Sequence, residues 1–360
     1  MIALPPMPPE SAIDPHAVAA DLRRWAGELG FSACGIAPPA VGWDEERLMA
    51  WLRRGHQAEM AFMGRHGRKR ARPRQLVPGT RSVVVVRLDY APQAADPVAT
   101  LRDRTRGYVA RYALGRDYHR LMRRRLQRLA ERLSAAIGPF GYRAFVDSAP
   151  VLERALAREA GLGWIGKNTM LLNRRAGSLF FLGELFTDLA LPTDAPAASH
   201  CGSCRACLAA CPTGALVGPY QLDARRCIGY LTVEHPGPIP EALRPAVGNR
   251  IFGCDDCLLA CPWNRQAPPS AEDAFQPRHG LDAPALAELF RWDEATFRER
   301  TAGSPIRRLG YERWSRNLAV ALGNAPATAP VLAALQARRA DPSALVREHV
   351  AWALARLGHL

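Results

Sequence analysis

Eight of the nine cysteines lie between residues 201 and 261, at spacings that suit iron–sulfur chemistry. The stretch CGSCRACLAACP at 201–212 has the pattern C-x2-C-x2-C-x3-C-P, and CDDCLLACP at 254–262 repeats the last three cysteines and the proline of that pattern. Thiolates at this spacing wrap a [4Fe–4S] cluster, and in two-cluster ferredoxins the last cysteine of each run binds the other cluster. The sequence therefore predicts two [4Fe–4S] clusters.

The exchange of the last cysteine assigns four ligands to each cluster. The first cluster takes Cys201, Cys204, Cys207 and Cys261. The second run lacks its usual first cysteine, so the second cluster takes Cys211, Cys254, Cys257 and, by elimination, Cys227. A four-thiolate zinc site is the alternative. A zinc ribbon has no use for the third close cysteine or the proline that follows, and we therefore favour clusters.

Two further features could be mistaken for reactive sites. The stretch GLGWIGKNTM at 161–170 fits the dinucleotide-binding motif G-x-G-x-x-G and nearly fits a phosphate loop. Asn168, however, stands where the phosphate loop needs a Ser or Thr hydroxyl. In nucleotide-binding proteins, both motifs directly follow a β-strand. The preceding VLERALAREA has apolar residues at helical spacing, which disfavours nucleotide binding. Cys34, alone in FSACGIAP, is interpreted as a small buried hydrophobic residue rather than a ligand.

The remaining sequence must position these cysteines, and it predicts two further parts. Helical and strand patterns alternate over the first 190 residues or so, with strands expected at 81–90 and 142–146, paired strands at 178–191 and a long helix at 117–138. The fold class is therefore α+β, with an α/β domain at 1–192 and a ferredoxin-like two-cluster domain at 193–268. A linker, QAPPSAEDAFQP, leads into 269–360, where helical stretches resemble HEAT-like repeats.

Composition narrows the classes of partner and compartment. The 360 residues carry 48 Lys and Arg against 34 Asp and Glu, and this net charge of +14 predicts attraction to polyanions, with nucleic acid first. No apolar run reaches the length of a membrane span, and the N-terminus lacks the basic start and apolar core of an export signal. A cytoplasmic chain is expected, in which cysteines indicate metal rather than disulfides.

Several long motifs in a fixed order, together with the cysteines, resemble one family: the epoxyqueuosine reductases, which modify tRNA and are related to cobalamin-dependent reductive dehalogenases. The motifs are RHGRKRARP (65–73), RYALGRDYH (111–119), VDSAPVLER (146–154), GLGWIGKNTMLL (161–172), CIGYLTVEH (227–235), GNRIFGCDDC (248–257) and CPWN (261–264). The resemblance runs over most of the chain, and it also makes Cys227 the missing ligand of the second cluster.

The resemblance implies a cobalamin, cob(II)alamin at rest, held base-off between the N-terminal and cluster domains. Its substrate would be epoxyqueuosine at the wobble position of tRNA, reduced to queuosine by cob(I)alamin that the two clusters supply with electrons. The HEAT-like region would contact the tRNA. A low-potential electron donor of the flavodoxin or ferredoxin type would feed the clusters, and a monomer is expected.

Turning an epoxide into an alkene consumes two electrons and two protons and releases water, so the site needs an acid. The resemblance makes Asp147 this proton donor, with a pKa raised by burial. The alternative is that Asp147 caps the helix predicted at 151–160, although Ser148 could take that position. The other candidates for cobalamin contact are Arg70, Tyr112, Ser148, Trp164, Lys167, Asn168, Tyr230 and Asp255.

Three histidines, His66, His119 and His235, are interpreted as surface or core residues rather than cobalt ligands. Two other functions use the same cofactors in part. A reductive dehalogenase would act on organohalides, but those of the respiratory kind typically carry an export signal and lack a helical C-terminus. An electron-transfer subunit would leave the N-terminal domain and the basic helical region without a role.

Overall fold

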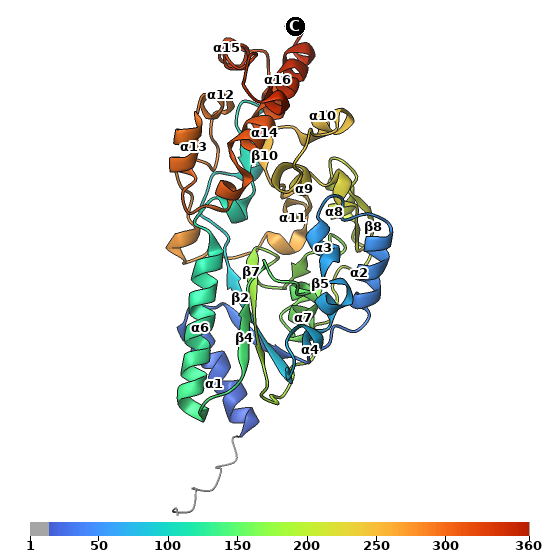
Figure 1. The fold of residues 1–360 in the computed structure, drawn as a ribbon, viewed down its shortest axis with the longest axis vertical. Helices are drawn as coiled ribbons and strands as arrows, with labels where there is room; N and C mark the ends of the chain where they lie inside the picture. The colour runs from blue at the N-terminus through green and yellow to red at the C-terminus, as the bar shows by residue number, and fades with distance from the viewer. Residues whose placement is uncertain (1–13, 360) are drawn as a thin grey trace, which may run out of the picture.

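The computed structural model describes residues 14–359, with a sheet at one end, the C-terminal helices at the other and the cysteine-bearing segments between them (Figure 1). Within the described residues, no helix combines the length and apolar character needed to cross a bilayer. The expectation about an export signal concerns mainly residues 1–13, which lie outside the described residues.

The sheet has four strands in the order β1 (Ala33–Ala37), β2 (Ser82–Asp89), β7 (Phe180–Thr187) and β4 (Tyr142–Phe145), and every neighbouring pair is antiparallel. The paired strands expected at 178–191 are wrong, because β7 runs as one strand beside β2, from Ser82 opposite Thr187 to Asp89 opposite Phe180. Gly183 does not break this strand. A Cβ at Gly183 would lie 3.0 Å from Leu126, so the glycine lets a helix pack closely on the sheet.

Helices cover both faces of this sheet. On one face, α1 (Pro15–Glu28) and α6 (Tyr118–Ile137) pack against alternate strand residues such as Val84 and Val86. On the other face, α7 (Glu153–Glu159) packs against Val83 and Val85. The side chains of a strand alternate between faces, so the unbroken apolar run of β2 reflects burial on both sides. Asp117 begins α6 by accepting a hydrogen bond from the backbone N–H of His119 at 2.9 Å.

Shorter elements complete the first part of the chain. They are α2 (Asp44–Arg53), α3 (Ala61–Arg65), η1 (Gly67–Ala71), α4 (Pro73–Leu76), α5 (Pro97–Arg102), β3 (Tyr108–Val109), η2 (Arg111–Ala113), and the hairpin of β5 (Trp164–Ile165) with β6 (Leu171–Leu172). In this hairpin a Cβ at Gly163 would lie 2.2 Å from the carbonyl oxygen of Leu172. The glycine at this position therefore serves the close approach of two strands.

The cysteine-bearing part is tied to the first part by a parallel pairing of β10 (Arg250–Phe252) with β3. Its other elements are α8 (Ala206–Ala210), β8 (Leu216–Gly218), β9 (Gln221–Leu222), α9 (Ile228–Val233), α10 (Arg244–Val247) and α11 (Asp256–Leu259). Most are one or two turns long. Side chains bound to a cluster would supply the order that so little regular structure cannot.

The C-terminal helices share one hydrophobic core with residues from both earlier parts, including Val109, Leu114 and Phe252. These helices are α12 (Leu286–Phe290), α13 (Glu294–Arg300), α14 (Tyr311–Gly323), α15 (Ala329–Gln336) and α16 (Ala344–Arg356), with η7 (Pro305–Leu309) before α14. The expected linker is also packed, since Ser270 donates hydrogen bonds to the carbonyls of Ala91 and Asp89. The region from 269 onward is therefore built into the molecule.

Candidate functional site

The four cysteines predicted for the first cluster line one cavity of about 310 Å³. Trp164 and Trp263 pack beside Cys261 and Cys201, with the two indole rings 5.3 Å apart. The buried indole N–H of Trp164 has no hydrogen-bond acceptor within the protein. A cavity lined by four thiols, with a donor lacking its acceptor, fits a sulfide-containing cluster.

The cysteines predicted for the second cluster lie deeper. Burial, followed by the electrostatic influence of Cys227, Asp255, Cys211 and Cys207, raises the pKa of Cys257. Cys254 and Cys227 both pack against the small core formed by Ile228, Val247 and neighbouring residues. Among residues 14–359, no three His, Cys, Asp or Glu side chains converge as they would on a single metal ion.

A second cavity, of about 350 Å³, lies between the N-terminal part and the cysteine-bearing part. Its walls come from α2 and α3, from the loop and first residues of α7, from the 165–169 segment, and from Tyr220 and Leu222 around β9. This volume is in the range of small-molecule sites. The guanidinium of Arg70 lines it, is 8% exposed, and leaves its Nε without an acceptor. A buried donor of this kind fits a ligand with polar oxygen atoms.

Asp147 stands on the wall of this cavity, in the loop between β4 and α7. Its backbone has φ of 50°, a left-handed conformation uncommon outside glycine and usually held by its surroundings. The Tyr118 hydroxyl donates to Asp147 Oδ2 at 2.5 Å, and His119 Nε2 lies 3.4 Å from the same oxygen. The other ring nitrogen, His119 Nδ1, lies 2.7 Å from Asp117 Oδ1. On its other side, the backbone N–H of Asp147 donates to Glu153.

These hydrogen bonds determine whether Asp147 or His119 carries the proton at neutral pH. Burial acts to raise the pKa of Asp147, but the hydrogen bonds from His119 and Tyr118 outweigh it, and the pKa is lowered. The hydrogen bonds to Asp117 and Asp147 raise the pKa of His119 to about 9. The expectation of a raised pKa for Asp147 is therefore wrong. At neutral pH the proton lies on the imidazole, and the carboxylate is its partner.

The helix-cap alternative for Asp147 is also wrong. Helix α7 begins at Glu153 and has Leu152 at its N-cap, so Asp147 lies too far upstream to cap it. Ser148 does not cap this helix either, because its hydroxyl accepts a hydrogen bond from Arg123 at 2.8 Å. Asp147 is thus free to act at the cavity.

Two more carboxyl groups lie close behind Asp147. Burial, followed by the negative charge of Asp147, raises the pKa of Glu153 to about 8. Glu184 on β7 is fully buried, and neither carboxyl oxygen has a hydrogen-bond partner. Burial and the charges of Glu153 and Asp147 hold the pKa of Glu184 well above its ordinary value. Glu153 therefore carries a proton at neutral pH, and the neutral form of Glu184 is favoured.

We expect Glu184→Gln to raise the thermal midpoint at about pH 8 by roughly 1–2 °C for each kcal/mol gained, the shift that the unfolding entropy of a 360-residue chain implies, and to change it little at about pH 5. The pKa of Glu184 is higher in the folded than in the unfolded state, so its contribution to stability is present below the unfolded pKa and is lost as pH rises. Glutamine keeps the size without this loss. Calorimetry at both pH values checks it, and equal midpoint changes would contradict it.

Among residues 14–359, Arg70 and Asp147 are the predicted cobalamin contacts that line the larger cavity. Lys167 and Asn168 line the cysteine cavity instead. Lys167 Nζ donates to the carbonyls of Gly202 and Cys204 at 2.6 and 2.8 Å, and Asn168 Nδ2 lies 3.4 Å from the Cys257 carbonyl. The expected contact of these two side chains with a corrin is therefore corrected: they hold the cysteine segments.

The other candidates occupy structural positions. Tyr112 packs against Phe252 with ring centroids 6.1 Å apart. Asp255 is buried and accepts hydrogen bonds at 2.8 Å from the Tyr108 hydroxyl and the Arg111 N–H. Both lie between the N-terminal part and β10 and do not line the larger cavity within the described residues.

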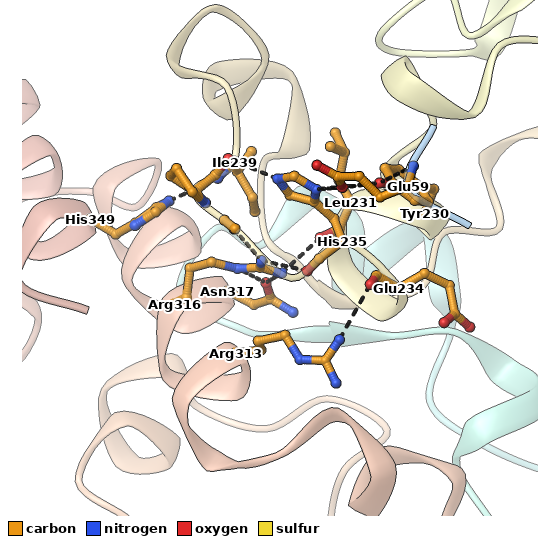
Figure 2. A network of polar contacts seen from close by, with 12 residues as sticks. Glu59, Tyr230, Leu231, Glu234, His235, Ile239, Arg313, Arg316, Asn317 and His349 are labelled. Atoms are coloured by element: carbon orange, nitrogen blue, oxygen red, sulfur yellow. Dashed lines mark hydrogen bonds and ion pairs between the residues drawn. The ribbon is translucent and has the colours of Figure 1, made fainter. Parts of the chain in front are cut away.

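Tyr230 belongs to a polar network that joins three parts of the chain (Figure 2). Its hydroxyl donates to Glu59, whose Oε2 lies 2.6 Å from His235 Nδ1. Arg316 of α14 donates to the carbonyls of Leu231 and His235, each at 2.8 Å. Figure 2 shows these side chains converging where α9, α14 and the segment before α3 meet. Tyr230 and His235 thus connect elements rather than contact the cavity.

Sequence reasoning missed Tyr118, His119, Glu153 and Arg308. Arg308 of η7 is exposed. Its positive charge lowers the pKa of Asp147, although burial and the hydrogen bonds from His119 and Tyr118 have larger effects on this pKa. The sequence offered one indication for His119: it lies two residues after Asp117, which caps the helix. At this spacing, the imidazole Nδ1 can contact the carboxylate of Asp117. The long-range contacts with Asp147 had no local signature.

Comparison with known proteins gives consistent matches. The family described as "Epoxyqueuosine reductase QueG, DUF1730" matches residues 70–148, and a "4Fe-4S double cluster binding domain" matches residues 200–264. The chain is 60% identical to an epoxyqueuosine reductase from Pseudomonas aeruginosa over 346 residues, covering 96% of both chains. It is 52% identical to that of Escherichia coli, covering 96% of this chain and 90% of the relative.

Two solved structures are similar over 96% of this chain and 91% of theirs, with a TM-score of 0.88 and 30% identity. One is epoxyqueuosine reductase from Bacillus subtilis with a catalytic loop, named for an aspartate, swung out of the active site. The other is an epoxyqueuosine reductase with an epoxyqueuosine-modified tRNA stem loop.

Proposed function

This chain belongs to the epoxyqueuosine reductase family, and from that premise we propose that it reduces epoxyqueuosine in tRNA to queuosine with a bound cobalamin, two [4Fe–4S] clusters and Asp147 as proton donor. It is an oxidoreductase. Identity of 60% over 96% of both chains favours this reaction over dehalogenation or simple electron transfer. One observation carries the proposal about the site: Asp147 is on the wall of the cavity between the N-terminal and cysteine-bearing parts, in contact with a proton-bearing histidine.

The residues around the larger cavity fit the cofactor that the family requires. Arg70 offers a buried donor without an acceptor, and Leu48, Phe62 and Val151 offer apolar contact. When bound and reduced, cobalamin would supply a two-electron reductant whose nucleophilic atom is cobalt. The protein's part is to hold it, exclude water and deliver protons.

The donor set fits two clusters, whose chemistry when bound is to pass electrons one at a time. We assign Cys201, Cys204, Cys207 and Cys261 to the first and Cys211, Cys227, Cys254 and Cys257 to the second. The first four share a cavity, which supports this division.

Proton delivery follows from the contacts of Asp147. His119 holds a proton on Nε2 at neutral pH, 3.4 Å from Asp147 Oδ2, and Asp117 fixes the ring through Nδ1. As negative charge develops on the epoxide oxygen, Asp147 passes on the proton that His119 supplies, so the oxygen leaves as water after a second proton. Tyr118 orients the carboxylate through its 2.5 Å hydrogen bond.

The rate of a single turnover should stay level across neutral pH and fall above about pH 9, because His119, with a pKa of about 9, then loses its proton. His119→Gln should lower the rate at pH 7 by roughly tenfold or more and abolish this high-pH fall. Rapid mixing of chemically reduced protein with epoxyqueuosine tRNA measures both. An unchanged pH profile in the variant would exclude His119 from the relay.

The tRNA would approach from the side of Arg308, which is exposed and acts electrostatically on Asp147. The C-terminal region that carries Arg308 also presents other exposed arginines, such as Arg298 and Arg300. Each phosphate contact gives log K a slope of about −0.7 to −0.9 against log salt. A cytoplasmic location and a flavodoxin- or ferredoxin-type donor follow from the tRNA substrate and the low potential required.

The deciding experiment incubates the reconstituted protein with epoxyqueuosine tRNA and a strong reductant, then measures the nucleoside by mass spectrometry. Loss of one oxygen atom, dependent on added cobalamin, is the expected result. Product formed equally well without cobalamin would refute the cofactor, and an unchanged nucleoside would refute the reaction.

A further inference from the structure

The first cysteine cavity reaches the molecular surface at Cys204. Cys204 is exposed, whereas Cys207 and Cys261 are buried and Cys201 is half-buried. The four cysteines of the second set are all half-buried. An electron carrier can therefore approach the first set of cysteines most closely beside Cys204.

The charged residues around Cys204 are all basic. The residues that line the cavity come from three segments, 161–178, 195–222 and 257–271, and these segments contain no Asp or Glu. Their basic residues are Lys167, Arg174, Arg175, Arg205 and Arg265, of which the four arginines are exposed. In the whole chain, by contrast, 34 acidic residues stand against 48 basic ones. We call these five residues the basic rim.

Several members of the basic rim are held at the cavity by direct contacts. Lys167 bonds to the carbonyl of Cys204 itself, and Arg205 is the next residue in the chain. Arg174 Nε lies 3.2 Å from the ring of His200, which lines the cavity. Arg265 is followed by Gln266, also in the cavity wall. The positive charge is therefore arranged around the one exposed cysteine.

We propose that the basic rim docks an acidic one-electron carrier protein, which delivers electrons to the first cluster beside Cys204. This rests on the proposed function. Each docking oxidises the carrier by one electron, and two dockings supply the pair that, with two protons, converts one epoxide into an alkene and water. Complementary charge raises the rate of encounter and fixes the orientation of such carriers.

An RNA partner for this surface is less favoured. The carboxylate that would serve the substrate, Asp147, lines the other cavity, and the residues lining the two cavities do not overlap. A base seated in the cavity beside Cys204 would not lie against Asp147, which lines the other cavity. Substrate and electron carrier thus have separate surfaces.

The test reverses two charges of the rim, Arg174→Glu with Arg205→Glu, in the cluster-loaded full-length protein. The control is Arg124→Glu with Arg128→Glu, which makes the same charge change at exposed positions of α6, across the sheet from the cysteine segments (Figure 1). The probe is a reduced acidic flavodoxin. Its affinity at low salt and its rate of oxidation on mixing are measured for both proteins and for the wild type.

The rim variant should lose at least tenfold in flavodoxin affinity and show a shallower salt dependence, while the control keeps both. Reduction by dithionite, iron content and tRNA affinity should not change. Unchanged flavodoxin affinity, or a loss of tRNA affinity instead, would overturn the proposal. If the double variant loses iron, Arg265→Glu replaces it and must lower flavodoxin affinity with full iron content. Wild-type protein that accepts electrons from flavodoxin but leaves epoxyqueuosine unreduced would refute the proposed function and not the docking surface.

Discussion

Asp147→Asn should lower the single-turnover rate of epoxide reduction by roughly 10²–10⁴, the usual effect of removing a positioned general acid. Asparagine keeps the size of the side chain and can still accept the hydrogen bond of Tyr118, so the left-handed loop and the cavity wall stay in place. It cannot take the proton of His119 and pass it on. Binding of cobalamin and tRNA, and reduction of both clusters, should therefore be retained.

A matched control is available in the next residue. Ser148→Ala removes the acceptor of Arg123 but no proton-transfer group, and we expect its rate to stay within a few-fold of wild type. The measurement is a single turnover under strong reductant, which bypasses the electron carrier. If Asp147→Asn and Ser148→Ala react at the same rate, Asp147 has no part in proton transfer.

The sequence predicted those features that depend on neighbours along the chain. The apolar run at β2 is buried on both faces, and the Asp117 cap and leucine spacing place α6 within one residue of its expected ends. Seven of the eight predicted ligand cysteines follow short local spacings, whereas Cys227 was assigned by elimination and by the family resemblance. These features have physical causes that lie within a few residues.

Features that depend on tertiary contacts were missed or misjudged. Asp147 was expected to have a raised pKa from burial alone, but Tyr118 and His119 come from a helix about 30 residues away and reverse the sign. The sequence gives no indication that Glu184 differs from other residues of a strand. In the folded protein its side chain is fully buried, because helices cover both faces of the sheet.

The packing of the C-terminal helices also depends on tertiary contacts that the sequence does not reveal. Helix α14 has the spacing of a repeat helix, but ten of its residues from Trp314 to Gly323 are buried, and Arg316 donates to carbonyls of the cysteine-bearing part. Removing the chain from 305 onward would therefore expose the shared core. Single charge substitutions at Arg298 or Arg300 are the better test of tRNA contact.

The second large effect is expected at Cys227, and it separates ligand from non-ligand cysteines. Cys227 precedes α9. Cys34 lies on β1 opposite Val86, packed against the core under α1, and burial raises the pKa of its thiol to about 12.

Anaerobically reconstituted wild-type protein should contain about eight irons per chain, from two four-iron clusters. We expect Cys227→Ala to retain about four irons per chain, because the three remaining thiols of the second cluster cannot complete a four-thiolate set. Cys34→Ala should keep about eight irons per chain. Iron analysis together with electron paramagnetic resonance of the reduced protein distinguishes one cluster from two. Cys34→Ala should fold, since it replaces one small buried side chain by another. Equal iron content in the two variants would show that Cys227 is not a ligand, and about four irons or stoichiometric zinc in the wild type would refute the two-cluster assignment itself.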